Sequence, residues 1–129
     1  MQIKTHLKIN QKLNGTPISI TEGQKGELLL RTTEDMVADE KGLIHGGFIF
    51  SAADYLAMIT VNHPNVVLGS SSVRFIKPVK VGDEIIFKSE VILTEGIKST
   101  VKVEGFKGEE KVFEGEFKCY SLDKHVLER

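Results

Sequence analysis

One stretch of the chain decides the fold: residues 45–62, which read HGGFIFSAADYLAMITVN. After the two glycines, apolar residues fall on every side of a helical wheel: Phe48, Ile49, Phe50, Ala52, Ala53, Leu56, Ala57, Met58, Ile59 and Val61. A helix that is apolar all round is buried in a core, and this one is too short and interrupted to cross a membrane. The residue before a proline disfavours the α region, so Pro64 marks its end. The stretch predicts a buried helix at about residues 47–62.

This helix carries one acid, Asp54, which a core helix should not have. No Lys or Arg occurs between residues 42 and 73, and an ionised carboxylate in an apolar interior is costly unless it is paired. At helical spacing Gly47, Ser51, Asp54 and Met58 form a narrow stripe of mostly small or polar residues. Two readings follow for Asp54. It is a carboxylate hydrogen-bonded to a neighbouring strand, or a catalytic acid or base whose pKa is raised by burial.

Composition narrows the class of protein. The chain has 129 residues, which suits one domain with a sizeable core. Its hydrophobic content of 40% and charged content of 27% are typical of soluble globular proteins. A net charge of −1 without an arginine-rich block argues against nucleic acid as a partner. The single Cys119 excludes an internal disulfide and cannot by itself form a zinc site. The start of the chain has no apolar run, so we expect neither a signal peptide nor a membrane anchor, and a cytoplasmic location.

Beyond the helix the hydrophobic period changes from 3.6 to 2. Turn signals separate six predicted strands, at residues 17–20, 27–32, 66–77, 84–93, 98–106 and 111–120. Along the third of these segments, residues 66–77, one side of the strand is expected to hold Val67, Ser71, Val73 and Phe75. One long buried helix and six strands that do not alternate with helices predict an α+β domain, an antiparallel sheet curled around a central helix. Residues 1–14 and 122–129 are expected to be peripheral.

The residues that open the helix suggest chemistry. His45, Gly46 and Gly47 stand where unsatisfied backbone N–H groups gather at the positive end of the helix dipole, and glycines let a ligand approach the backbone closely. Together they form a plausible oxyanion hole for a polarised carbonyl, with Asp54 as base. Glycines also serve tight turns and close packing, which is the structural alternative.

The spacing of these residues bears on assembly. Gly46 and Asp54 lie eight residues apart, about 12 Å along an α-helix. One carbonyl cannot meet a donor at Gly46 and also be attacked by water held on Asp54 of the same helix. If both residues act, they come from different subunits of a symmetric dimer. The spacing therefore predicts a homodimer with paired sites at the helix interface.

These residues resemble a known family. The HGG of residues 45–47, Asp54, and the segment SVRFIKPVKVGD at residues 72–83 are similar to the hotdog-fold thioesterases of the phenylacetyl-CoA thioesterase branch. The likeness covers roughly residues 26–121. It implies a helix wrapped by an antiparallel sheet, dimers or dimers of dimers, and hydrolysis of an acyl- or aryl-CoA thioester. By that pattern the Gly46 N–H polarises the thioester carbonyl, and Asp54 of the partner acts as base or nucleophile.

The resemblance implies no metal and no organic cofactor, with coenzyme A entering only as part of the substrate. Hotdog domains also serve as non-catalytic acyl-CoA or malonyl-CoA sensors, which is the alternative function. The family often carries an asparagine six residues before the histidine, and here that position is Asp39. A second acid there either raises the pKa of Asp54 by like-charge repulsion or points to solvent.

Further residues have both a functional and a structural reading. His45 either orients substrate or water, or fixes the loop before the helix. Tyr55 either lines the acyl pocket or fills core, and Gly47, Ser51 and Met58 are expected against the substrate. Three consecutive serine hydroxyls either hydrogen-bond to the acyl group or to a catalytic water, or form only local hydrogen bonds in their strand: Ser70, Ser71 and Ser72. Three cations either meet the phosphates of coenzyme A or are solvated: Arg74, Lys77 and Lys80. Cys119 is expected to be a buried strand residue.

Overall fold

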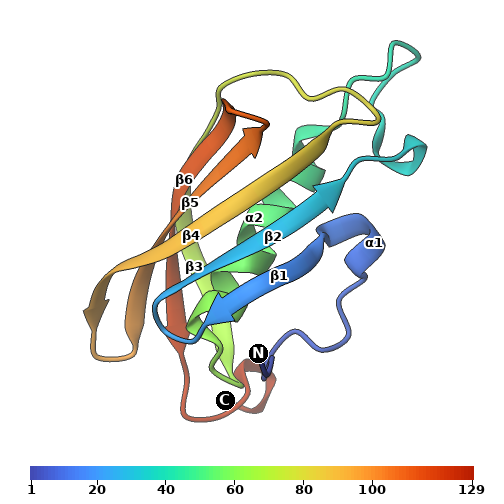
Figure 1. Ribbon diagram of the computed structural model, residues 1–129. Helices are drawn as coiled ribbons and strands as arrows, with labels where there is room; N and C mark the ends of the chain where they lie inside the picture. The colour runs from blue at the N-terminus through green and yellow to red at the C-terminus, as the bar shows by residue number, and fades with distance from the viewer.

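The computed structural model describes residues 1–129 and contains one long helix and one antiparallel sheet. The elements are α1 (Gln11–Asn14), β1 (Thr16–Thr21), β2 (Lys25–Arg31), α2 (Gly46–Val61), β3 (Val66–Phe75), β4 (Glu84–Glu95), β5 (Lys98–Lys107) and β6 (Glu110–Ser121), with short 3-10 turns at Glu34–Met36 and Val126–Glu128. The six strands run in the order β1-β2-β4-β5-β6-β3, and the sheet curves around α2 (Figure 1). The predicted α+β hotdog architecture is confirmed.

The long helix begins and ends where the sequence indicated. His45 is extended, with φ −64° and ψ 129°, and Asn62 adopts a left-handed conformation with φ 56°. The side chain of Asn62 accepts a hydrogen bond from the Lys4 N–H at 2.8 Å and donates one to the Gln2 carbonyl at 2.8 Å. These bonds satisfy the side-chain amide of Asn62 and hold the N-terminal segment against the C-terminal end of α2. The middle and C-terminal half of α2 is buried, as its apolar composition predicts.

The side of residues 66–77 that was predicted to hold Val67, Ser71, Val73 and Phe75 was wrong at its first residue, Val67. Ser71 of β3 lies opposite Phe117 of β6, on the core side of the sheet, but Leu68 rather than Val67 lies opposite the buried Cys119. A β-bulge between Leu68 and Ser70 shifts the register. An extra residue in one strand moves every side chain before it to the other face, so the alternation read across the whole strand could not hold.

The N-terminal segment is more ordered than its weak pattern indicated. The four-residue α1 is capped by the side chain of Asn10, which accepts a hydrogen bond from the Lys12 N–H. Gln11 donates to the hydroxyl of Tyr55 at 3.2 Å, and Asn14 accepts from the hydroxyl of Ser51. Both chain ends lie at the same end of the molecule (Figure 1). None of the helices combines the length and apolar character that a membrane span requires.

Candidate functional site

The carboxylate of Asp54 is partly buried and lacks a hydrogen-bond donor. Its Oδ1 is shielded from solvent and unpartnered. One turn earlier, Ser51 bonds to Asn14 of α1, whereas the ring of Phe50 packs on Phe117 of β6 with centroids 5.6 Å apart. Asp54 therefore lies between the part of α2 that contacts α1 and the part of α2 that contacts β6. No strand donates a hydrogen bond to it within this protomer.

Burial controls the chemistry of this carboxylate. It raises the pKa of Asp54 from 3.8 to about 6, and burial is the only cause. Desolvation disfavours the charged form of a carboxyl, and no neighbouring cation offsets it. A group that titrates about one unit below neutral pH is ionised at pH 7 yet basic enough to take up a proton, which suits a general base.

The thiol of Cys119 shows where Asp54 points. Cys119 is fully buried in β6, as predicted. Burial and then the charge of Asp54 raise its pKa to about 12. The thiol is therefore neutral and unreactive, and Asp54 lies close enough to β6 for its charge to be felt there.

The first turn of α2 presents free backbone donors. The N–H of His45 donates to the Met36 carbonyl at 2.9 Å, whereas the N–H groups of Gly46 and Gly47 have no acceptor in the protein. Gly47 leaves room for the exposed imidazole of His45, since a Cβ there would lie 3.0 Å from that ring. Such donors at a helix N-terminus favour an oxygen that carries negative charge.

An apolar cavity of about 250 Å³ opens beside Gly46. Four buried residues form its floor: Ile44, Ile49, Val79 and Val112. Three exposed apolar residues form its rim: Leu43, Phe75 and Ile76. The ring of Phe75 lies over Gly46, 3.4 Å from where a Cβ would stand. A group bonded to a carbonyl at the Gly46 N–H would thus meet an apolar surface on one side.

The Gly46 N–H and the Asp54 carboxylate do not meet within one protomer. Asp54 does not line the cavity that contains Gly46, and the two residues lie two helical turns apart, about 12 Å. The strand β3 is the last in the sheet, so one of its edges is unpaired. The free donors of Gly46 and Gly47, the unpartnered acid and the open edge of β3 are thus left without partners within the single chain.

Several predicted site residues lie in the core or serve local structure. Tyr55 is 2% exposed and Met58 is fully buried. The Ser51 hydroxyl is engaged by Asn14. Asp39 is exposed, and its Oδ1 accepts from the N–H groups of Lys41 and Leu43 at 3.0 and 3.2 Å, so it holds the turn before the helix. Asp39 does not contribute to the raised pKa of Asp54.

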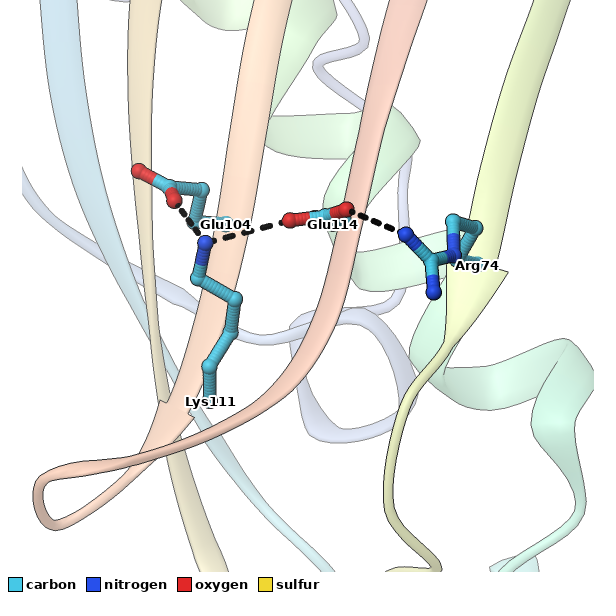
Figure 2. A network of polar contacts seen from close by, with 4 residues as sticks. All are labelled: Arg74, Glu104, Lys111 and Glu114. Atoms are coloured by element: carbon cyan, nitrogen blue, oxygen red, sulfur yellow. Dashed lines mark hydrogen bonds and ion pairs between the residues drawn. The ribbon is translucent and has the colours of Figure 1, made fainter.

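The polar candidates of β3 divide between the two sides of the sheet. Ser71 shares the core side with Phe117, whereas Ser70, Ser72 and Arg74 lie opposite residues of the outer face. Figure 2 shows Glu114 between Arg74 and Lys111, and Arg74 pairs with that carboxylate at 3.3 Å. This network continues to Glu104 on the neighbouring strand β5.

The remaining two cations lie beyond the end of β3. Lys77 stands at the edge of the apolar cavity. Lys80 is exposed, and its backbone pairs with Leu43 in an isolated bridge. Of the three predicted phosphate ligands, Lys77 is therefore the one that the fold brings beside Gly46.

Sequence reasoning missed the cavity itself. Phe75 was placed with Ser71 and Val73 on one side of its strand, which the register confirms, but its neighbour Ile76 and the floor residue Val112 carried no signal. Val112 precedes Phe113, and both are buried, which strict alternation along a strand does not allow.

Comparisons with known proteins agree with this architecture. A family model described as the thioesterase superfamily matches residues 41–114. A crystal structure of a protein from Pyrococcus horikoshii superposes with a TM-score of 0.95 at 50% identity, covering 98% of this chain and 97% of that one. A Streptococcus mutans protein solved bound to acetyl CoA shares the fold, with a TM-score of 0.80 at 20% identity over 94% of this chain and 99% of that one.

Two curated relatives are longer than this chain. Methylthioribose-1-phosphate isomerase of Aquifex aeolicus is 63% identical over 117 residues, which are 91% of this chain and 25% of that protein. Transcription factor FapR of Caldanaerobacter subterraneus is 33% identical over 115 residues, which are 89% of this chain and 58% of that protein. The chain thus spans about a quarter of the first relative and just over half of the second.

Proposed function

The chain belongs to the thioesterase superfamily, and we propose that it hydrolyses acyl- or aryl-CoA thioesters in the cytoplasm with Asp54 as the catalytic carboxylate. The observation that carries the proposal is the state of Asp54. Its Oδ1 is buried without a partner, and its pKa is raised to about 6. A structural carboxylate on a core helix would be expected to accept hydrogen bonds, and this one accepts none.

The second part of the proposal is that each site is shared between two copies of the chain. The Gly46 N–H of one protomer faces the thioester carbonyl, and Asp54 of its partner activates the water. The separation of about 12 Å along α2 supports this arrangement, because it is too long for both residues to act from one helix. A homodimer, or a dimer of such dimers, provides two equivalent sites by symmetry.

The reaction follows from these two groups. Asp54 takes a proton from water as the water oxygen bonds to the thioester carbon, and the charge that develops on the carbonyl oxygen is stabilised by the Gly46 N–H. The carbon–sulphur bond then breaks, and the protonated Asp54 returns its proton to the departing thiolate. The products are a carboxylic acid and the coenzyme A thiol. In the second route the Asp54 carboxylate attacks the carbonyl carbon, and the carbon–sulphur bond breaks to release the coenzyme A thiolate. Water then cleaves the resulting anhydride to the carboxylic acid and the Asp54 carboxylate, and the thiolate takes up the proton released.

A panel of coenzyme A thioesters tests the proposal. Acetyl to palmitoyl and aryl thioesters are incubated with the protein, and free thiol is measured, while light scattering gives the oligomeric state. Turnover above background for at least one thioester, by a dimer or larger assembly, is the expected result. An active monomer at micromolar concentration would contradict the shared site.

The alternative function is a non-catalytic acyl-CoA binder. It is favoured by the similarity to a protein named as a transcription factor, which is 33% identical over 89% of this chain. Flat background rates across the panel, together with tight binding of an acyl-CoA by calorimetry, would select this alternative over the enzyme.

A further inference from the structure

The outer face of the sheet, which points away from α2, carries a row of charged side chains across its strands. Lys25 of β2 lies opposite Glu90 of β4, which lies opposite Lys102 of β5. Lys102 in turn lies opposite Glu116 of β6. All of these side chains are exposed. Neighbouring strands lie about 4.8 Å apart, so the row spans about 14 Å, and its charges alternate: plus, minus, plus, minus.

The charges of this row do not form ion pairs within the chain. Opposite charges directly across two strands attract one another, yet Lys25, Glu90, Lys102 and Glu116 take part in none of the ion pairs of the protomer. The next row differs, because its acids on β5 and β6 both pair with Lys111 (Figure 2). The central row therefore leaves its charges available to groups from another molecule.

Lys102 stands between two hollows of this face. One hollow, of about 360 Å³, is also lined by Lys25 and Glu90. The other, of about 400 Å³, is also lined by Glu116. No hydrophobic residue lines either hollow, whereas pockets for drug-like small molecules are mostly apolar. The hollows suit charged side chains of a partner protein together with bridging water.

An alternating row of this kind is complementary to a second copy of itself. A twofold axis between β4 and β5, parallel to the strands, can bring two outer faces together. It places Glu90 of one copy against Lys102 of the other, and Lys25 against Glu116, and each of these pairings occurs twice by symmetry. The axis passes through the middle of the face, because β4 and β5 are the two central strands of the sheet (Figure 1).

The neighbouring row fits the same axis. Lys88 of β4 lies opposite Glu104 of β5, so the axis places Lys88 of one copy against Glu104 of the other. Farther from the axis it brings Glu27 of β2 towards Glu114 of β6. The charge of Glu114 is already compensated by two cations of its own chain, so this like-charge meeting weakens the match only slightly.

We propose that the outer face binds the outer face of a second copy of this chain, with Glu90 and Lys102 as the central pairs. This contact lies on the opposite side of the sheet from α2 (Figure 1), so it leaves the proposed thioester site free. It joins two dimers of the kind proposed above into a tetramer. A contact made by exposed charges is weakened by salt, so the assembly depends on ionic strength.

Charge reversals test this contact. Lys102→Glu brings two acids together across the axis, and Glu90→Lys brings two lysines together, so each variant should weaken assembly by about tenfold or more. Lys124→Glu makes the same charge change at an exposed residue of the C-terminal tail and should have no effect. Light scattering gives the mass at about 50 mM and about 500 mM salt. The parent should have twice the mass of either variant at low salt and lose that difference at high salt, and melting temperatures show that the variants are folded.

Mixing the two variants distinguishes a contact between chains from a contact within one. The Glu90→Lys chain is cationic at both central positions and the Lys102→Glu chain is anionic at both, so each repels its own copies and attracts the other. The mixture should therefore recover the parental mass at low salt, which no contact within a chain can produce.

Two results would overturn the proposal: a parental mass that neither salt nor charge reversal changes, or a mixture that keeps the mass of the separate variants. Thioester hydrolysis is measured on the same samples and should be equal in the parent and both variants. Because the proposed reaction does not use Glu90 or Lys102, failure of the contact with hydrolysis intact leaves the proposed function standing.

Discussion

Replacing Asp54 by Asn should lower activity and raise stability at the same time. The asparagine keeps the shape of the side chain but removes the base, and loss of a general base costs ~10² to 10⁴ in rate. It also removes a buried negative charge. The gap between a pKa of 3.8 in the unfolded chain and about 6 in the folded one corresponds to about 3 kcal/mol.

The sign of the stability effect depends on pH. Below pH 3.8 the carboxyl is protonated in both states, and the parent and Asp54→Asn proteins should be equally stable. As the pH rises from 3.8 to about 6, the unfolded chain ionises before the folded one, so the parent loses stability relative to the variant. Above about pH 6 the difference should be constant, with the variant more stable by up to about 3 kcal/mol.

One preparation of each protein provides both measurements. Single-turnover thioester hydrolysis at pH 8 gives the rate, and denaturant unfolding at pH 3.5, 5 and 8 gives the free energy of unfolding. The control is Asp123→Asn, which neutralises an exposed carboxylate of the C-terminal tail and should change neither quantity. Unchanged hydrolysis by Asp54→Asn would refute the catalytic role. Lower stability at pH 8 with an unchanged rate per folded molecule would make Asp54 a structural carboxylate.

Three further predictions concern the same site. The rate should rise with pH through a midpoint of about 6, as Asp54 ionises, and a pH profile of kcat/KM without that limb would contradict it. Gly46→Pro should lower kcat by ~10² to 10³ because it removes the N–H donor. Gly46→Ala keeps the donor and serves as the control. The proline variant should fold, because proline is tolerated at the first residue of a helix and the preceding His45 already has the extended backbone that a following proline requires. Mixing inactive Gly46→Pro and Asp54→Asn chains should restore about a quarter of parental activity if the sites are shared between subunits, and none if each site lies within one subunit.

The sequence predicted the features that depend on composition and period. The helix at Gly46–Val61 was readable because its apolar residues surround the axis, and the strands were readable because their period is 2. Asp54 was conspicuous because no cation lies near it in the chain, and its partial burial and raised pKa agree with that reading. These are properties of local sequence that tertiary structure did not override.

The features that were missed depend on contacts between distant segments. Helix α1 has only four residues, too few to be stable from propensity alone, and it is held by bonds from Gln11 and Asn14 to α2. The cavity depends on a bulge at Val112 and on the arrival of Phe75 over Gly46. A bulge adds one residue to one strand, which shifts the alternation without leaving a sign in the composition.

In the proposed mechanism one helix, α2, carries both halves of the site, and both groups lack partners within the protomer. The Gly46 N–H at its start has no acceptor within the chain. The Asp54 Oδ1 two turns later is buried without a donor, and this unpaired atom makes the chain less stable than it could be. A thioester would satisfy the first and a bound water the second, but only where two copies place the start of one helix beside the middle of the other. Stability is therefore lowered at the position where the proposed reaction needs a base, as expected if this site trades stability for activity.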